Sequence, residues 1–256
     1  MDPLTTAWLE ALERRHLANL TTSEVARALR ALSSCYVERR GKLSEGGALA
    51  SAGKRAAFAL FYGPLHFLVV RRILQSLSEA RAGLSTIVDL GCGTGAAGAA
   101  WALEAGATTI RGFDRHPWAV DEANQTYRQL RLDGRAQQRD IAGIGAASGQ
   151  SRDGLRITPQ SGLIAAYAAN ELAAPGREAL LSWLLAARER GARVLVVEPI
   201  ARRSLPWWDD WAAAFERSGG RADEWRFPAE LPATQRGLAR AAGLDPRELT
   251  ARSLFL

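Results

Sequence analysis

The feature that most constrains the fold is a run of glycines in residues 87–98, IVDLGCGTGAAG, with glycine at positions 91, 93, 95 and 98. A short apolar stretch at 86–90 leads into this run, and a small-residue stretch with helical character follows at 96–106. Glycines at such a strand-to-helix junction let the backbone turn sharply and approach a ligand closely. The run therefore predicts a ligand at the carboxyl end of the first strand of an α/β unit.

The glycine spacing fits two cofactors. Gly93, Gly95 and Gly98 spell G-x-G-x-x-G, which is typical of dinucleotide binding. Asp89 and Gly91, with the next two glycines, spell D-x-G-x-G-x-G, which favours S-adenosylmethionine (SAM). A dinucleotide puts its pyrophosphate at the helix N-terminus and has no use for a carboxylate there. SAM has no phosphate, and its ammonium group favours the Asp89 carboxylate, so we expect SAM.

Strands alternate with helical segments after the first 82 residues. The expected strands are 86–90, 109–113, 135–139, 163–167, 193–197, 222–227 and 249–256. The expected helices between them are 96–106, 117–131, 176–190, 207–218 and 233–242. This alternation predicts βαβ units and a parallel sheet.

The first 82 residues are expected to be helical. Helices are predicted over 4–40 and 54–82, the second broken near Gly63–Pro64, with a small-residue connector at 41–53. The chain thus divides into a helical N-terminal region, 1–82, and a SAM-binding domain, 83–256.

The bulk composition is that of an ordinary globular protein, with 47% hydrophobic residues and a net charge of +6. The net charge indicates an anionic partner only weakly, because arginine and alanine are abundant along the whole chain and the charge partly reflects this compositional bias. Cys35 and Cys92 are the only cysteines and make neither a disulfide framework nor a metal site. No apolar run approaches the ~20 residues that span a bilayer, so we expect a cytoplasmic protein without a membrane partner.

The stretch VDLGCGTG, followed by GFD at 112–114, resembles motifs I and II of class I SAM-dependent methyltransferases. The resemblance covers residues 84–256. It implies a Rossmann-like α/β fold whose seven strands follow the order 3-2-1-4-5-7-6, mostly parallel, with strand 7 antiparallel. The residues it places around SAM, or its product S-adenosylhomocysteine (SAH), are Gly91, Cys92, Gly93 and Gly95 at the methionine part, Asp89 at the ammonium group, Asp114 at the ribose, and Asp140 and Ile141 at the adenine. Tyr62 is expected to border the cofactor.

Three flanking stretches narrow the resemblance. RAAFALFYGPLHFLVVRRIL, AAYAANEL and VLVVEPI are similar to the family of mitochondrial small-ribosomal-subunit methyltransferase-like proteins and their bacterial relatives. That resemblance spans residues 36–256 and implies an association with ribosomal small-subunit RNA. Larger members carry extra cysteines for an iron–sulfur cluster. With only two cysteines, this chain is expected to lack the cluster, and its ribosomal role is less secure.

The candidate catalytic residues follow the fourth strand. Asn170 and Glu171 stand where the methyl group should point, and either could orient or deprotonate an acceptor, or simply cap a helix and lie at the surface. His66 is a candidate base or a packed core residue. The Asn/Asp-Pro-Pro-aromatic motif of exocyclic-amine methyltransferases is missing. No cysteine follows strands four or five, which argues against covalent C5 chemistry on a pyrimidine.

Candidate substrate residues follow the fifth strand. Arg202, Arg203, Trp207 and Trp208 interleave cations with indoles, which suits stacking on a base or on a flat small molecule. The indoles could equally form one buried helix face with Trp211. The sequence thus predicts a methyltransferase whose first candidate acceptor is ribosomal RNA. The alternatives are a small-molecule methyltransferase and a non-catalytic SAM-binding factor of ribosome assembly.

Overall fold

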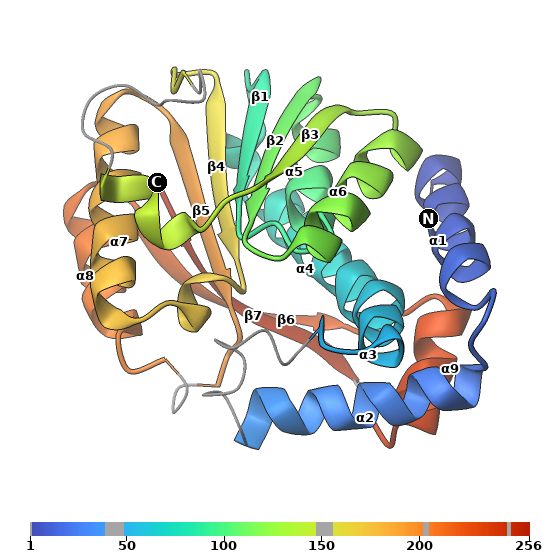
Figure 1. The fold of residues 1–256 in the computed structure, drawn as a ribbon. Helices are drawn as coiled ribbons and strands as arrows, with labels where there is room; N and C mark the ends of the chain where they lie inside the picture. Colours follow the sequence, from blue (N-terminus) through green and yellow to red (C-terminus); the bar gives the residue numbers. More distant parts are fainter. Residues whose placement is uncertain (1, 39–48, 147–155, 202–204, 245–246) are drawn as a thin grey trace.

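The computed structural model describes residues 2–38, 49–146, 156–201, 205–244 and 247–256. At its centre lies a seven-stranded sheet with helices on both faces (Figure 1). The strands are β1 (Thr86–Leu90), β2 (Thr109–Asp114), β3 (Asp133–Gln138), β4 (Ser161–Ala166), β5 (Arg193–Glu198), β6 (Arg221–Pro228) and β7 (Glu248–Phe255). Their order is β3-β2-β1-β4-β5-β7-β6, and only β7 runs antiparallel to its neighbours. The expected fold class and strand order are confirmed.

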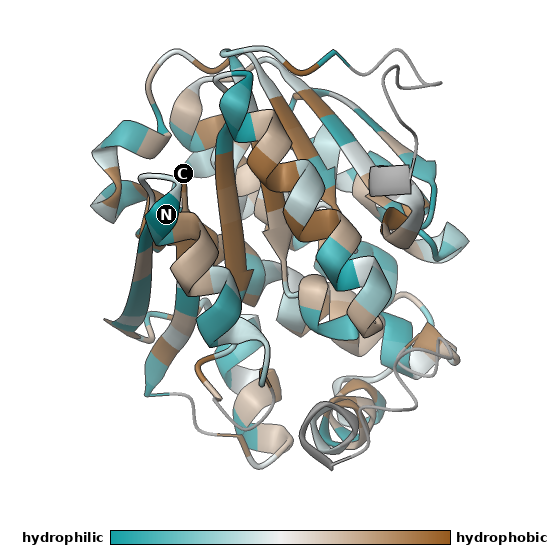
Figure 2. Ribbon diagram, turned by 90° about the vertical axis from the view of Figure 1, so that its left-hand side faces the viewer, coloured by the Kyte–Doolittle hydropathy of each residue, from teal (hydrophilic) through white to brown (hydrophobic). Residues whose placement is uncertain are grey.

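The central strands are apolar because both of their faces are covered. All six residues of β4 and five of the six of β5 are buried, as parallel strands inside an α/β sheet require. Successive residues of β1 point to opposite faces. Ile87 joins the core on one side of the sheet, and Val88 joins the core on the other side. Figure 2 shows hydrophobic residues concentrated in the central strands and the helices against them.

Each face of the sheet has its own helices (Figure 1). One face carries α4 (Gly63–Ser76), α5 (Ala96–Ala105) and α6 (Pro117–Gln129). The opposite face carries α7 (Ala174–Glu189) and α8 (Trp208–Arg217). The two hydrophobic cores are therefore separated by the sheet.

The N-terminal helices pack on the first of these faces. They are α1 (Pro3–His16), α2 (Thr22–Glu38) and α3 (Ala52–Ala57). The α2 helix lies beside α9 (Ala233–Ala241), and Arg30 donates to the carbonyls of Ala241 and Ala242 at 2.9 and 3.2 Å (Figure 1). Trp8 and Leu29 belong to the same buried cluster as Ile87 of β1. The division at residue 82 stays a prediction, and the two regions share this core.

The predicted break at Gly63–Pro64 is wrong. The chain stays helical from residue 52 to residue 76, with a π-helical turn, η3 (Phe58–Tyr62), just before the proline. Pro64 has no amide hydrogen for the carbonyl of Leu60, four residues earlier. Gln235 of α9 donates its Nε2 hydrogen to that carbonyl at 2.9 Å. The helix thus continues because a distant element supplies a bond that the proline removes.

The helical segment Ala52–Ser76 is long and apolar enough to cross a membrane by length and composition alone. The expectation from the sequence, that no apolar run approaches membrane-spanning length, is therefore wrong for this segment. Its most apolar 18-residue window is 61% buried inside the protein, as in the core helix of a globular fold.

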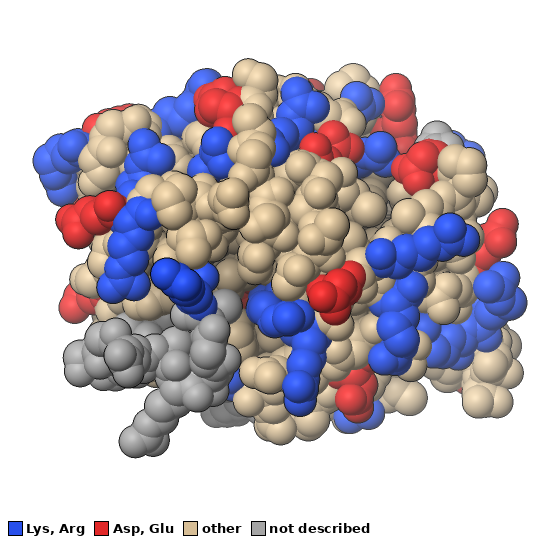
Figure 3. Space-filling model, turned by 90° about the horizontal axis from the view of Figure 1, so that it is seen from above, with Lys and Arg blue, Asp and Glu red and all other residues tan. Residues whose placement is uncertain are grey.

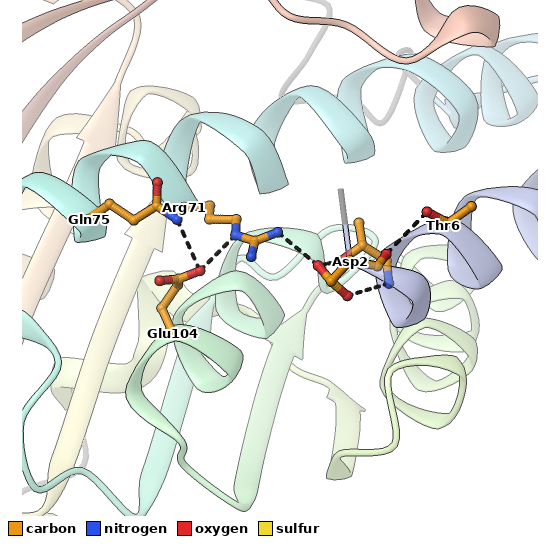
Figure 4. Close-up of polar contacts among 6 residues, drawn as sticks. Asp2, Thr6, Arg71, Gln75 and Glu104 are labelled. Atoms are coloured by element: carbon orange, nitrogen blue, oxygen red, sulfur yellow. Dashed lines mark hydrogen bonds and ion pairs between the residues drawn. The ribbon is translucent and has the colours of Figure 1, made fainter.

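Arg71 ties the first helix to the sheet domain (Figure 4). It lies on α4 and donates to Glu104 of α5 at 2.7 Å and to Asp2 at 3.0 Å. Asp2 in turn caps α1 by accepting from the backbone N–H of Thr5 at 2.9 Å. One guanidinium therefore links three helices.

Candidate active site

A cavity of about 810 Å³ opens at the carboxyl ends of β1, β2 and β4. Ligand pockets in proteins span about 300–1,000 Å³, and in α/β folds they lie at this edge of the sheet. The expected site residues that line it are Tyr62, His66, Gly91, Cys92, Gly93, Asp114, Asp140, Ile141, Asn170 and Glu171. The structure thus brings together most residues that the sequence analysis singled out.

The glycine loop closes one side of the cavity. Gly91 has φ of 70°, and a Cβ atom there would lie 2.5 Å from the Cβ of Ala168, so only glycine fits. Gly95 has φ of 75° and meets Tyr127 of α6 instead, where a Cβ atom would lie 2.7 Å from the ring. Gly95 does not line the cavity. Its role in this structure is to let α5 and α6 approach each other.

Asp89 lies behind the loop rather than against the cavity. Its side chain is buried, and it accepts a hydrogen bond from Gly98 N–H in the first turn of α5 at 3.0 Å. Burial, together with the charge of Asp114, raises the pKa of Asp89 to about 7. In this structure Asp89 fixes the junction between the loop and α5, and its expected contact with the ammonium group, directly or through water, stays a prediction.

Asp114 ends β2 and faces the cavity. Its two carboxylate oxygens accept from Gly93 N–H at 2.9 Å and from His116 N–H at 2.8 Å. These bonds hold the carboxylate beside the glycine loop, where it can receive the ribose hydroxyls of SAM. Burial raises the pKa of the Cys92 thiol well above its usual value, so this residue is a small neutral part of the wall.

Asp140 and Ile141 lie on the cavity wall after β3. Asp140 also accepts from Ala142 N–H at 2.9 Å, at the start of η5 (Ile141–Ala146). Ile141 is 7% exposed and gives this end of the cavity an apolar surface. A carboxylate beside an apolar side chain suits an adenine ring, so the donor and acceptor groups present fit SAM.

Aromatic side chains form another part of the cavity wall, where Phe58 lies against Gly93 of the glycine loop. His66 stacks on Tyr167, with ring centroids 4.0 Å apart and an interplanar angle of 17°. Phe58 and Tyr62 of η3 lie beside His66, at 6.2 and 6.1 Å between ring centroids. Burial lowers the pKa of His66 to about 3, so its imidazole is neutral at pH 7. This part of the wall is aromatic and uncharged, and within it the rings of His66 and Tyr167 are nearly parallel.

Asn170 and Glu171 belong to η6 (Ala169–Glu171), the short turn after β4. Asn170 donates its backbone N–H and its Nδ2 hydrogen to the buried carboxylate of Glu198. Glu171 lies 3.6 Å from Arg115. Burial raises the pKa of Glu171 to about 7, with Asp114 adding to the shift and Arg115 opposing it. Near neutral pH this carboxyl group can both accept and release a proton.

The candidate substrate residues Trp207 and Trp208, after β5, do not line the cavity. Arg202 and Arg203 lie outside the described residues. Trp207 and Trp208 are 9% and 5% exposed and pack with Trp211 in the core beneath α8. The predicted role of the two indoles in stacking on a substrate is wrong in this structure, and the buried helix face is what forms.

Sequence reasoning missed several residues of the cavity wall. Tyr167 directly follows β4 at the ligand-binding edge of the sheet, a position that could have marked it. It is also one of two non-glycine residues in the described chain with positive φ, at 58°. Leu249 and Thr250 reach the cavity from β7, far along the chain. No local pattern could have revealed them.

Comparisons with known proteins agree with this site. The family profile of the methyltransferase small domain matches residues 70–147, which include the glycine loop, Asp114 and Ile141. No curated protein matches the chain by sequence.

Several solved structures are similar to this chain. The mitomycin 7-O-methyltransferase superposes with a TM-score of 0.50 and 14% identity, over 100% of this chain and 75% of its own. The methyltransferase domain of a bacterial Hen1 protein superposes with a TM-score of 0.48 and 13% identity, over 75% of this chain and 97% of its own. A precorrin-6y C5,15-methyltransferase from Geobacter metallireducens superposes with a TM-score of 0.45 and 11% identity, over 73% of this chain and 86% of its own.

The strand order, the site and the matched domain point to one chemistry. The sheet has the expected class I order, and the glycine loop and Asp114 meet at one cavity. The matched domain covers this part of the chain. Residues 70–147 therefore match a methyltransferase small domain, within a sheet of the class I methyltransferase order, and members of that domain family use SAM as methyl donor.

Proposed function

We propose that the enzyme methylates a small, flat molecule that lies against the aromatic wall of the cavity. The observation that carries this proposal is the stacked pair of His66 and Tyr167 on the wall beside Asn170 and Glu171. Flat, uncharged aromatic surfaces favour stacking with a planar ring. Small-molecule sites combine such an apolar lining with a few polar groups, which here are Asn170 and Glu171.

The charge around the cavity favours a small acceptor over RNA. Arg115, a basic residue on the wall, is paired with Glu171. Proteins that bind single-stranded RNA combine a basic groove with exposed aromatic residues. Trp207 and Trp208, which could have supplied stacking, are buried. The face at the opposite edge of the sheet mixes basic and acidic side chains (Figure 3).

Different residues of the cavity wall bind the cofactor and accept the proton from the acceptor. SAM, when bound, supplies an electrophilic methyl group. Asp114 and the glycine loop bind the cofactor, and Asp140 and Ile141 receive its adenine. Glu171 accepts the proton that the acceptor loses, since its pKa near 7 leaves an ionised fraction at neutral pH. Much of the acceleration in such a transfer can come from positioning alone.

Ribosomal RNA, the first candidate acceptor from the sequence, becomes the second candidate in this proposal. The net charge of +6 and the three flanking stretches favour it. The same features support a non-catalytic role in ribosome assembly, and for all three functions we propose the cytoplasm as the location. The mitomycin 7-O-methyltransferase is named for a small molecule, but a likeness at 14% identity concerns the fold alone.

Methyl transfer from labelled SAM separates the candidates. We expect transfer to members of a panel of hydroxylated and aminated aromatic compounds, and none to small-subunit RNA. SAH binding by calorimetry is measured alongside. Transfer to RNA alone would move the assignment to the RNA acceptor. SAH binding without transfer to either class would favour the assembly factor.

A further inference from the structure

Asn170 is held in one orientation by Glu198. Its backbone N–H donates to Glu198 Oε1 at 3.0 Å, and its Nδ2 donates to Glu198 Oε2. Glu198 is the last residue of β5 and is 0% exposed. Both of its carboxylate oxygens therefore act as acceptors for the same residue. Turning the amide of Asn170 over would place two oxygens against each other, so the assignment of its nitrogen and oxygen is fixed by its partner.

The other end of this amide belongs to the cavity. Asn170 lines the cavity, and the carboxylate lies on its Nδ2 side. Oδ1, the other polar atom of the same amide group, accepts no hydrogen bond within the described part of the chain. Nor is it among the buried side-chain oxygens that lack a partner, so it remains accessible. Because Asn170 lines the cavity, this oxygen is available there as a hydrogen-bond acceptor, next to Glu171 in the chain.

We propose that Glu198 is a positioning residue that presents Asn170 Oδ1 to the acceptor, and that the acceptor carries an O–H or N–H group at the end that enters the cavity. This inference rests on the proposed small-molecule function. An accepting oxygen selects ligands that bring a hydrogen and disfavours ligands that bring a lone pair. Because Glu198 touches neither cofactor nor acceptor in this arrangement, it acts through Asn170.

The test uses two ligands that share a ring and differ in the hydrogen. Phenol and anisole are titrated by ligand-observed NMR onto the full-length protein saturated with SAH. We expect phenol to bind about three- to tenfold more tightly than anisole, the worth of one hydrogen bond. Asn170→Ala should bring this ratio to about one, because no accepting oxygen remains.

Glu198→Gln tests the positioning role. It replaces one accepting oxygen with an N–H donor, so Asn170 turns its Oδ1 toward that donor and presents Nδ2 to the cavity. The ratio of phenol to anisole affinity should then fall, while anisole, whose oxygen accepts, binds no worse than before. The double variant should match Asn170→Ala alone, because Glu198 acts through Asn170. Glu189→Gln, on the exposed face of α7, is the matched control and should leave the ratio unchanged.

Calorimetry with SAH and a thermal melt accompany every variant. A merely structural role for Glu198 would weaken phenol and anisole alike and leave their ratio unchanged, which would overturn the positioning role. An unchanged ratio in Asn170→Ala, or equal or absent binding of both ligands by the SAH-bound wild type, would overturn the inference. Failure of the wild type to bind SAH would instead overturn the proposed function.

Discussion

Asp114 serves the cofactor and the loop at once. It faces the cavity and accepts from Gly93 and His116. Asp114→Ala should weaken SAH binding roughly ten- to a hundredfold, because charge-assisted hydrogen bonds are worth about 1.5–3 kcal/mol. Isothermal calorimetry measures this, with Asp121→Ala on the exposed side of α6 as the control. Equal affinity of the two variants would remove Asp114 from the cofactor site.

Glu171 should give the reaction its pH dependence. A base works in its ionised form, so with a pKa of about 7 we expect kcat/KM to rise as the pH increases toward 7 and to level off above it. Glu171→Gln should lower kcat and remove this rise while leaving SAH affinity nearly intact. Initial rates across pH 5.5–9 with an acceptor from the panel provide the measurement. A rise that survives in the variant would assign it to another group.

Asp89 should make the ligand-free protein less stable as the pH rises. Its pKa is about 7 in the folded state and lies near 3.9 in unfolded chains, so between these values the folded protein holds a proton that the unfolded chain has lost. The contribution of Asp89 to the free energy of unfolding is therefore complete below pH ~4. It falls by about 1.4 kcal/mol per pH unit between pH ~4 and pH ~7, and it levels off above that range.

The variant that tests this is Asp89→Asn, which keeps an oxygen for Gly98 N–H but does not titrate. Urea unfolding at pH 5, 6 and 7 should show its stability relative to wild type increasing with pH by about 1 kcal/mol per unit. Asp210→Asn on the exposed side of α8 is the control. Parallel curves for Asp89→Asn and wild type would contradict the linkage.

Sequence reasoning reached individual residues when their role depends on the local chain. Gly91 and Gly93 after β1 and Asp114 after β2 are determined by strand–turn–helix geometry, and the structure places these three at one cavity. The hydrogen bond from Gly98 N–H to Asp89 was not predictable, because it depends on how α5 packs against β1. The predicted stacking of Trp207 on a substrate was wrong because the exposure of residues after β5 depends on how α8 packs on the sheet.

At the scale of elements, the helix through Pro64 depends on α9. Gln235 donates to the carbonyl of Leu60, which Pro64 cannot serve. Gln235→Met should leave that carbonyl unpaired and lower the free energy of unfolding by about 1–3 kcal/mol. In a Pro64→Ala background, which restores the missing amide hydrogen, the same change should cost less. Urea unfolding of the four proteins measures the coupling. Equal costs in both backgrounds would mean that the two residues act independently.

The positions of the helices and strands were predictable because hydrophobic periodicity and the residues that end helices and strands are local signals in the sequence. Predicted and observed strands differ by at most two residues at any boundary, for example 135–139 against Asp133–Gln138 for β3. The π-helical turn at Phe58–Tyr62 was not predictable, since nothing near Pro64 indicates that α9 stabilises the helix across it.

At the scale of the whole molecule, Arg71 joins the N-terminal helix to the sheet domain. Arg71→Ala removes two carboxylate partners, one of them the cap of α1. These groups are partly exposed, so we expect a loss of only about 1 kcal/mol in the free energy of unfolding, smaller at high salt. Urea unfolding at low and high salt measures it, with Arg14→Ala, exposed on α1, as the control. A loss that salt does not reduce would point to packing of the side chain instead.

The sheet order was predictable from the resemblance, but the arrangement of the N-terminal helices was not. Their apolar stripes show that they bury a face and do not say against what. The contacts of α2 with α9 join segments about 200 residues apart, and only the folded chain reveals them.

The two cores on either side of the sheet divide the eight tryptophans equally. Trp8, Trp101, Trp118 and Trp225 lie in or against one core, and Trp183, Trp207, Trp208 and Trp211 lie in or against the other. None of them lines the cavity. Tryptophan fluorescence should therefore change little when a ligand binds in the cavity and should change when the packing of either core is lost. Replacing the indoles of one face with phenylalanine would give an optical probe for the other face alone, and comparing two such proteins would reveal whether both sides of the sheet melt together.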